Sequence, residues 1–167
     1  DSVDYFVPDS QVLVWAVRLL GGMASRRAYG PEFLPLCIAA TPAPFTHYFL
    51  GGSEECLAKL LEKMGALQPG IRIVGSHHGY FGDSDDAGIV EEINRLAPDF
   101  IWVGLGTPKQ QLWIHRNRGV IRRGVLLAVG FAFDVNAGTK ADAPRWLGRL
   151  GLTWLYRMVR EPRRLFW

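Results

Sequence analysis

The stretch DFIWVGLGTPKQQLWI, residues 99–114, decides how the chain folds. Its first part, Phe100 to Val103, is bulky and apolar, as expected of a buried strand. The segment Gly104-Leu105-Gly106-Thr107-Pro108 then ends the strand, and helical spacing resumes through Gln110 to Ile114. A strand that ends in glycines and leads into a helix is the repeating unit of an α/β protein.

The same unit recurs along the chain. Short apolar runs bounded by turn residues predict parallel strands at 3–7, 46–51, 71–75, 99–104 and 124–130. Helical periodicity predicts helices at 9–20, 53–66, 85–97 and 108–118, and a helix followed by a proline-rich connection within 31–45. Asp9 or Ser10 is expected to cap the first of these helices, and Ser53 the next. The alternation predicts an α/β sandwich with a mostly parallel sheet flanked by helices.

The composition is that of one ordinary globular domain: 167 residues with a net charge of +3. Cys37 and Cys56 are too few for a disulfide framework, so reduced, buried thiols and a cytosolic compartment are expected. No apolar run approaches the roughly 20 residues of a membrane-spanning helix, and no signal peptide opens the chain.

The C-terminal segment 141–167 is basic and aromatic, with six arginines against Asp142 and Glu161. Such a segment favours an anionic partner: a phosphate group, an anionic lipid surface or nucleic acid. A docked helix with a solvated arginine face is the alternative. Trp154 and Tyr156 beside arginines also suit a membrane interface, or else a buried contact in an oligomer.

Glycine-rich segments follow four of the predicted strands, at 50–55, 74–81, 103–110 and 129–138. Ligands of open α/β sheets bind beyond the carboxyl ends of the strands, so four such loops indicate a nucleotide-sized cleft. Glycines that only make tight turns are the alternative. The segments contain no P-loop, and Lys109 occupies the third glycine position of a dinucleotide fingerprint.

Few acids and bases accompany these loops. Asp9 is expected to follow the first strand and to face the cleft, or merely to cap a helix. Asp134 follows the last strand, and Lys109 or Gln110 would meet a phosphate or a sugar hydroxyl. No Cys/His cluster has metal-ligand spacing, so we expect no structural zinc.

The signature segments resemble those of the WecG/TagA/CpsF family, glycosyltransferase family 26. VGLGTPKQQLWI (103–114) is similar to the family's G-x-G-x-P-K-Q-E segment, and IVGSHHGYF (73–81) to its I-x-G-x-x-x-G-Y-F. VPDSQVLVWAVRLLGG (7–22) resembles its P-D-G helix start, and RRAYGPEFL (26–34) its R-x-x-G segment. Residues 124–165 resemble its V-G-[GA]-x-F-D, R-A-P-x-W and G-L-E-W segments. The resemblance runs from Val3 to Leu165.

This resemblance implies a Rossmann-like fold called GT-E with a basic C-terminal helical appendage. Residues 1–140 would be the nucleotide-sugar-binding catalytic domain, lacking its N-terminal part, and 141–167 part of the appendage. The implied activity is an inverting, metal-independent transfer of a sugar from a UDP-sugar to a polyprenyl-diphosphate-linked saccharide, without a cofactor, for bacterial cell-surface polysaccharides. The implied place is the cytoplasmic face of the plasma membrane, bound peripherally to anionic lipid. A homo-oligomer is compatible with the resemblance, and a nucleic-acid partner is not expected.

The resemblance also implies roles for single residues. Asp9 aligns with the catalytic base, Arg27 with an arginine near the diphosphate, and Gln110 with a glutamine that lines the pocket. Arg157, Arg163 and Arg164 would stabilise the leaving diphosphate. The other expected substrate-binding positions lie in the glycine-rich loops: Gly51, Gly52, Gly79, Tyr80, Phe81, Gly104, Gly106, Thr107, Pro108, Lys109 and Asp134.

Five positions depart from the family's pattern: Ser10, Gln111, Phe131, Asp142 and Thr153. They motivate an alternative function, a non-catalytic member that binds a nucleotide-sugar or a protein partner. A nucleic-acid-binding module that uses the arginine tail is a third reading, which the scarcity of lysine disfavours. The donor stays open, because N-acetylmannosamine, glucose and glucuronic acid donors all suit the family.

Overall fold

The structure is a computed structural model that describes residues 4–5, 7–23, 26–82 and 84–160. The described residues divide into two compact units. Residues 30–140 form the first, which we call the sheet unit. Residues of 4–29 and of 141–160 form the second, which we call the helical unit.

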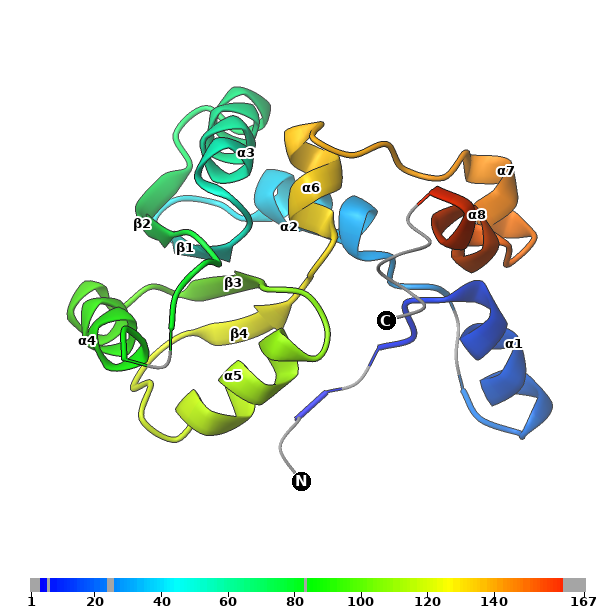
Figure 1. Ribbon diagram of the computed structural model, residues 1–167, viewed down its shortest axis with the longest axis horizontal. Coiled ribbons are helices and arrows are strands. Elements are labelled where there is room, and N and C mark those ends of the chain that lie inside the picture. The colour runs from blue at the N-terminus through cyan, green and yellow to red at the C-terminus, as the bar shows by residue number, and fades with distance from the viewer. Residues whose placement is uncertain (1–3, 6, 24–25, 83, 161–167) are drawn as a thin grey trace. The chain divides into compact units, whose positions relative to one another are not determined.

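The sheet unit contains four parallel strands in the order β2-β1-β3-β4 (Figure 1). Their bounds are Thr46–Gly51 for β1, Arg72–His77 for β2, Phe100–Gly104 for β3 and Val125–Ala128 for β4. Phe49 pairs with Ser76 of β2 on one side and with Trp102 of β3 on the other. The predicted α/β class with a parallel sheet is therefore confirmed. All four strands end at the same edge, which is where the glycine-rich loops begin.

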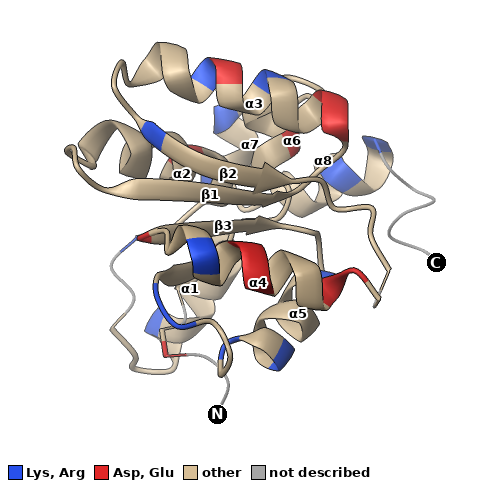
Figure 2. Cartoon of the chain, turned by 90° about the vertical axis from the view of Figure 1, so that its left-hand side faces the viewer, with Lys and Arg blue, Asp and Glu red and all other residues tan. Residues whose placement is uncertain are grey.

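Helices cover both faces of this sheet (Figures 1 and 2). One face carries α2 (Gly30–Ala40), α3 (Glu54–Leu67) and α6 (Ala132–Ala137), and the other carries α4 (Asp86–Leu96) and α5 (Lys109–Asn117). Successive strand side chains alternate between the faces. Phe49 and Trp102 thus enter the core under α2 and α3, while Tyr48 and Ile101 enter the core over α4 and α5.

The helical unit consists of α1 (Gln11–Leu19), α7 (Arg145–Arg149) and α8 (Thr153–Arg160). Ser10 caps α1, since its Oγ accepts a hydrogen bond from the Leu13 N–H at 3.1 Å. The turn between α7 and α8 packs on α1 at Gly151, where a Cβ would lie 3.0 Å from Val12 and 3.1 Å from Trp15. Residues of 4–29 and 141–160, which are far apart in the sequence, therefore fold together, and local periodicity did not indicate this.

Two sequence-based expectations require correction. Residues 4, 5 and 7 are not in a strand, and Tyr5 and Val7 are exposed, so the predicted strand at 3–7 is wrong where the structure describes it. The segment after β4 is a short helix, α6, rather than a glycine loop. No helix in the described ranges combines the length and the apolar character needed to cross a bilayer.

Candidate functional site

Backbone contacts join the loops that leave the first three strands of the sheet unit. The Gly52 N–H donates to the Gly104 carbonyl at 3.3 Å, and the Gly79 N–H donates to the Gly52 carbonyl at 2.7 Å. At Gly51, with φ of 136°, a Cβ would lie 2.4 Å from the Gly104 carbonyl carbon. Only glycine permits this approach. We call these loops, 51–52, 79–81 and 104–110, the glycine edge.

Lys109, in the first turn of α5, makes hydrogen bonds to the glycine edge. Its Nζ donates to the Gly79 carbonyl at 2.9 Å and to the Phe81 carbonyl at 3.3 Å. The same ammonium lies 4.2 Å from the centroid of the Phe81 ring, a cation–π distance. Lys109 therefore holds the loop after β2 against the start of α5. This is a positioning role beside the phosphate contact that the sequence suggested.

Gln110 places an unusual acceptor at the same edge. Its side chain is only 6 % exposed, and among the described residues its Oε1 has no hydrogen-bond partner. The loop after β4 passes directly over it, because a Cβ at Gly130 would lie 3.1 Å from that Oε1. A buried unpaired acceptor costs about 1–3 kcal/mol. A ligand N–H or O–H would remove that cost.

Thr107, Tyr80 and Asp134 are further positions of the sheet unit that the sequence analysis expected to bind substrate. Thr107 Oγ1 accepts from Gln111 Nε2 at 3.2 Å, and Tyr80 is 77 % exposed. Asp134 lies in α6, where its carboxylate accepts from Thr139 Oγ1 at 3.2 Å and lies 3.6 Å from Lys140 Nζ. Asp134 thus contacts groups that directly follow its own helix.

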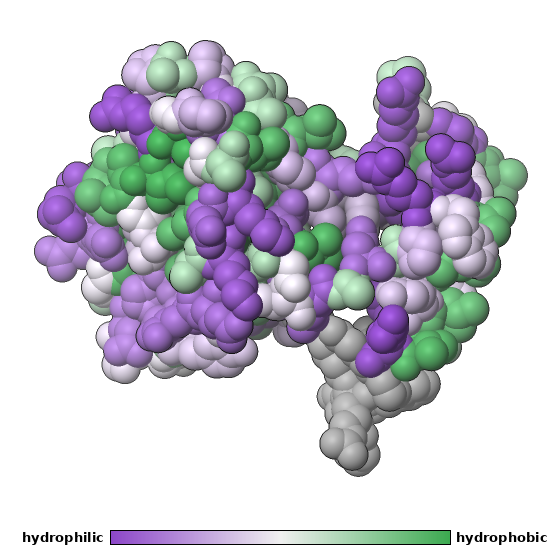
Figure 3. All heavy atoms as spheres, turned by 90° about the horizontal axis from the view of Figure 1, so that it is seen from above, coloured by the Kyte–Doolittle hydropathy of each residue, from purple (hydrophilic) through white to green (hydrophobic). Residues whose placement is uncertain are grey.

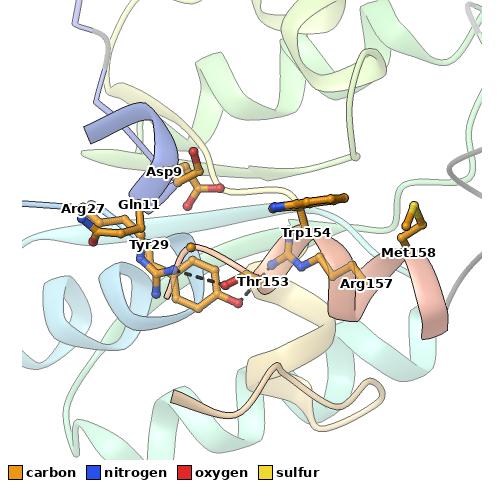
Figure 4. Close-up of a pocket in the computed structure, with 10 residues that line it drawn as sticks. Asp9, Gln11, Arg27, Tyr29, Thr153, Trp154, Arg157 and Met158 are labelled. Carbon is orange, nitrogen blue, oxygen red and sulfur yellow. Dashed lines mark hydrogen bonds between the residues drawn. The ribbon is translucent and has the colours of Figure 1, made fainter. Parts of the chain in front are cut away.

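The helical unit contains a pocket of about 360 Å³ (Figure 4). Asp9, Arg27 and Arg157, which the sequence singled out, all line it. They come from the start of α1, from the segment before α2 and from α8. The full lining comprises Asp9, Ser10, Gln11, Arg27, Tyr29, Gly151, Thr153, Trp154, Arg157 and Met158. The tertiary structure therefore brings together a carboxylate and two guanidinium groups that are far apart in the sequence.

Tyr29 connects the two arginines of this pocket. The Arg27 guanidinium carbon lies 4.1 Å from the centroid of the Tyr29 ring, and Arg157 Nη2 donates to the Tyr29 hydroxyl at 3.0 Å (Figure 4). That hydroxyl in turn donates to Asp142 Oδ1. Burial, and then the hydrogen bond to Asp142, raise the pKa of Tyr29 well above its usual value. The phenol is therefore neutral at every physiological pH.

Arg27 has a second contact, because its Nη1 donates to Thr153 Oγ1 at 3.5 Å. Two positions that depart from the family's pattern, Asp142 and Thr153, thus contact Tyr29 and Arg27 directly. Tyr29 itself was not predicted as a site residue, and neither were Trp154 and Met158. The only local feature of the sequence that could have indicated Tyr29 is its position two residues after Arg27.

Within the described ranges, no group of three His, Cys, Asp or Glu residues is placed to hold a metal ion. The His77 and His78 rings lie 4.7 Å apart and tilted. Arg163 and Arg164 lie outside the described residues.

Comparison with known proteins agrees with the resemblance of the signature segments. The sequence profile of the "Glycosyl transferase WecG/TagA/CpsF family" matches residues 1–167. This chain belongs to the WecG/TagA/CpsF family. In family terms, the glycine edge is built by its I-x-G-x-x-x-G-Y-F and G-x-G-x-P-K-Q-E segments. The arginine-containing pocket is built by the P-D helix start, the R-x-x-G segment and the C-terminal segments.

Three curated relatives share the name N-acetylglucosaminyldiphosphoundecaprenol N-acetyl-beta-D-mannosaminyltransferase. The Bacillus spizizenii protein is 30 % identical over 164 residues, covering 98 % of this chain and 63 % of the relative. The Bacillus subtilis protein is 30 % identical over 162 residues, covering 96 % and 62 %. A Staphylococcus aureus protein is 30 % identical over 166 residues, covering 99 % and 65 %. The chain spans just under two thirds of the length of these WecG/TagA/CpsF relatives.

Proposed function

We propose that this chain belongs to a glycosyltransferase that moves a sugar from a UDP-sugar to a polyprenyl-diphosphate-linked saccharide, with inversion and without a metal. The observation that carries the proposal is the pocket in which the Asp9 carboxylate accompanies Arg27 and Arg157. A general base and cationic groups for a leaving diphosphate are what such a transfer requires. Membership of the WecG/TagA/CpsF family supports the same reaction class.

In the proposed reaction, Asp9 takes the proton of the acceptor hydroxyl while the hydroxyl oxygen attacks the anomeric carbon. A new glycosidic C–O bond forms as the bond between that carbon and the UDP oxygen breaks, which inverts the anomeric configuration. UDP departs with the bonding electrons, and the proton leaves Asp9 for solvent. Arg27 and Arg157 stabilise the charge on the departing diphosphate through charge-assisted hydrogen bonds.

We propose that the glycine edge of the sheet unit also binds substrate. The buried Gln110 Oε1 offers an acceptor for an N–H or O–H of the substrate. The names of the three relatives make UDP-N-acetylmannosamine the first donor to test and N-acetylglucosaminyl-diphosphoundecaprenol the first acceptor.

The experiment uses the complete native protein with a panel of UDP-sugars and a short-chain lipid-diphosphate acceptor, and it measures release of UDP. We expect Asp9→Asn to lower kcat about 10²- to 10⁴-fold, the usual effect of losing a general base. Glu62→Gln, an exposed carboxylate on α3, is the matched control and should leave kcat unchanged. Absence of UDP release with every donor, or an unchanged rate for Asp9→Asn, would contradict the proposal.

The alternative is a family member that binds a nucleotide-sugar or a protein partner without turnover. Its support is the set of five departures from the family's pattern. Asp142 and Thr153, however, have specific partners in the pocket, so these two departures belong to an intact cluster of contacts. UDP binding without acceptor-dependent UDP release would favour the alternative.

We further propose peripheral binding to the cytoplasmic face of the plasma membrane through α8. Trp154, Leu155 and Val159 are exposed on this helix, and the exposed Arg160 accompanies them. Hydrophobic residues reach the surface of the helical unit at the right of Figure 3. Exposed aromatic and aliphatic residues beside arginines suit the headgroup region of an anionic membrane. A homo-oligomer that covers the same residues is the competing explanation.

A further inference from the structure

Two positive side chains converge on one ring in the pocket of the helical unit. The guanidinium carbons of Arg27 and Arg157 lie 4.1 Å and 5.7 Å from the centroid of the Tyr29 ring. Like charges this close repel, and their flexible side chains would separate unless something held them. The ring face attracts the Arg27 guanidinium, and the hydroxyl oxygen accepts from Arg157. Tyr29 therefore contacts each arginine with a different part of its side chain.

Asp142 fixes the direction of this hydrogen-bonded chain. A neutral phenol has one proton to donate, and the Tyr29 hydroxyl donates it to Asp142 Oδ1. The same carboxylate oxygen accepts from the Ala143 N–H at 2.8 Å, which holds Asp142 in place. The lone pairs of the Tyr29 oxygen are thus left for Arg157 Nη2. The chain runs from Arg157 through Tyr29 to Asp142, and its negative end offsets part of the arginine charge.

We propose that Tyr29 and Asp142 form a positioning pair that holds Arg27 and Arg157 ready for a phosphate-bearing ligand. Tyr29 is 5 % exposed, and its ring and hydroxyl contact both arginines. Guanidinium groups that are already ordered lose less conformational entropy when they bind phosphate. The inference rests on the proposed function for the identity of the ligand, a nucleoside diphosphate.

The test measures binding of UDP and of inorganic pyrophosphate to the complete native protein by calorimetry. Tyr29→Phe keeps the ring beneath Arg27 and removes only the hydroxyl. We expect it to raise the Kd of both ligands about tenfold, since a hydrogen bond that orients a charged group is lost. Uridine, which has no phosphate, should bind Tyr29→Phe and the unaltered protein equally. A variant that merely loosened the fold would weaken uridine as well.

Tyr48→Phe is the matched control. Tyr48 is also a buried tyrosine whose hydroxyl donates to a carboxylate, Glu92, at 3.1 Å, but it lies in the core of the sheet unit. Tyr48→Phe should leave the Kd of pyrophosphate within twofold of the value for the unaltered protein. Asp142→Asn is a second variant, and it should weaken pyrophosphate less than Tyr29→Phe, because the amide oxygen can still accept from the phenol.

Unchanged pyrophosphate binding in Tyr29→Phe would overturn the positioning role, as would equal losses in Tyr29→Phe and Tyr48→Phe. A protein that does not bind pyrophosphate at all, or binds it equally after Arg157→Gln, would also overturn it. A different result would reject the proposed function without rejecting the positioning pair. Pyrophosphate binding that depends on Arg157 and Tyr29, without sugar transfer in the UDP-release experiment, would reject the transferase and leave the positioning pair standing.

Discussion

At the scale of the residue, Asp99 joins the beginnings of two neighbouring strands. Its Oδ2 accepts from the Thr46 N–H at 2.8 Å and from the Thr46 hydroxyl at 2.9 Å, and its Oδ1 accepts from Arg123 at 2.7 Å. These hydrogen bonds, led by that of the Thr46 N–H, lower the pKa of Asp99 from 3.8 to about 2. The ionised carboxylate is therefore part of the folded state.

We expect Asp99→Ala to lower the free energy of unfolding by about 2–3 kcal/mol, because several hydrogen bonds to a charged acceptor are lost. The Asp99 contribution is complete above the unfolded pKa and is lost as the pH falls from 3.8 to about 2, since the unfolded chain then binds the proton more tightly. Urea denaturation at pH 7 and at several pH values below 4 measures both effects. Glu62→Ala, on the exposed surface of α3, should change stability by less than about 0.5 kcal/mol. An Asp99→Ala protein as stable as this control would contradict the expectation.

At the scale of the element, the sequence located most strands and helices because their apolar periodicity is local. The strand at 46–51 and the Ser53 cap of the next helix agree with β1 and α3 as observed. The short helix α6 was missed, since a helix of six residues is too short to display a helical period. The strand at 3–7 was wrongly predicted because a short apolar run has the same pattern whether or not a partner strand pairs with it.

Two glycines in neighbouring elements provide a sharp contrast. Gly51→Ala should destabilise the protein by more than about 2 kcal/mol and disturb the glycine edge, because its Cβ would strike the Gly104 carbonyl at a φ of 136°. Gly65→Ala lies inside α3 with open space around it, and should stabilise the protein by about 0.5–1 kcal/mol. Thermal unfolding of both variants compares them directly. Equal effects would mean that the close approach at Gly51 is not a constraint.

At the scale of the whole molecule, the proposed membrane association depends on several side chains of α8 acting together. We expect the complete native protein to bind vesicles containing anionic lipid and to lose affinity as salt is raised. Arg160→Gln should weaken this binding about fivefold, since one basic residue near the membrane contributes about 1 kcal/mol. Arg95→Gln, the same change on α4 of the sheet unit, should have no effect.

Co-sedimentation with anionic and with neutral vesicles measures this difference. Equal partitioning of Arg160→Gln, Arg95→Gln and the unaltered protein would argue against α8 as the membrane contact. A concentration-dependent change in molecular mass that disappears with Val159→Asp would instead favour an oligomer interface on that helix.

The sequence by itself determined the α/β class with a mostly parallel sheet, and the family, because these depend on local periodicity and contiguous motifs. The strand order β2-β1-β3-β4 came from the tertiary structure. Only the tertiary structure decided that Tyr29 bridges Arg157 and Asp142, which lie 128 and 113 residues away. It also decided that Lys109 donates to carbonyls some 30 residues earlier. Contacts between segments that are distant in the sequence depend on the tertiary fold. They produce no periodic pattern in the sequence, so local analysis does not detect them.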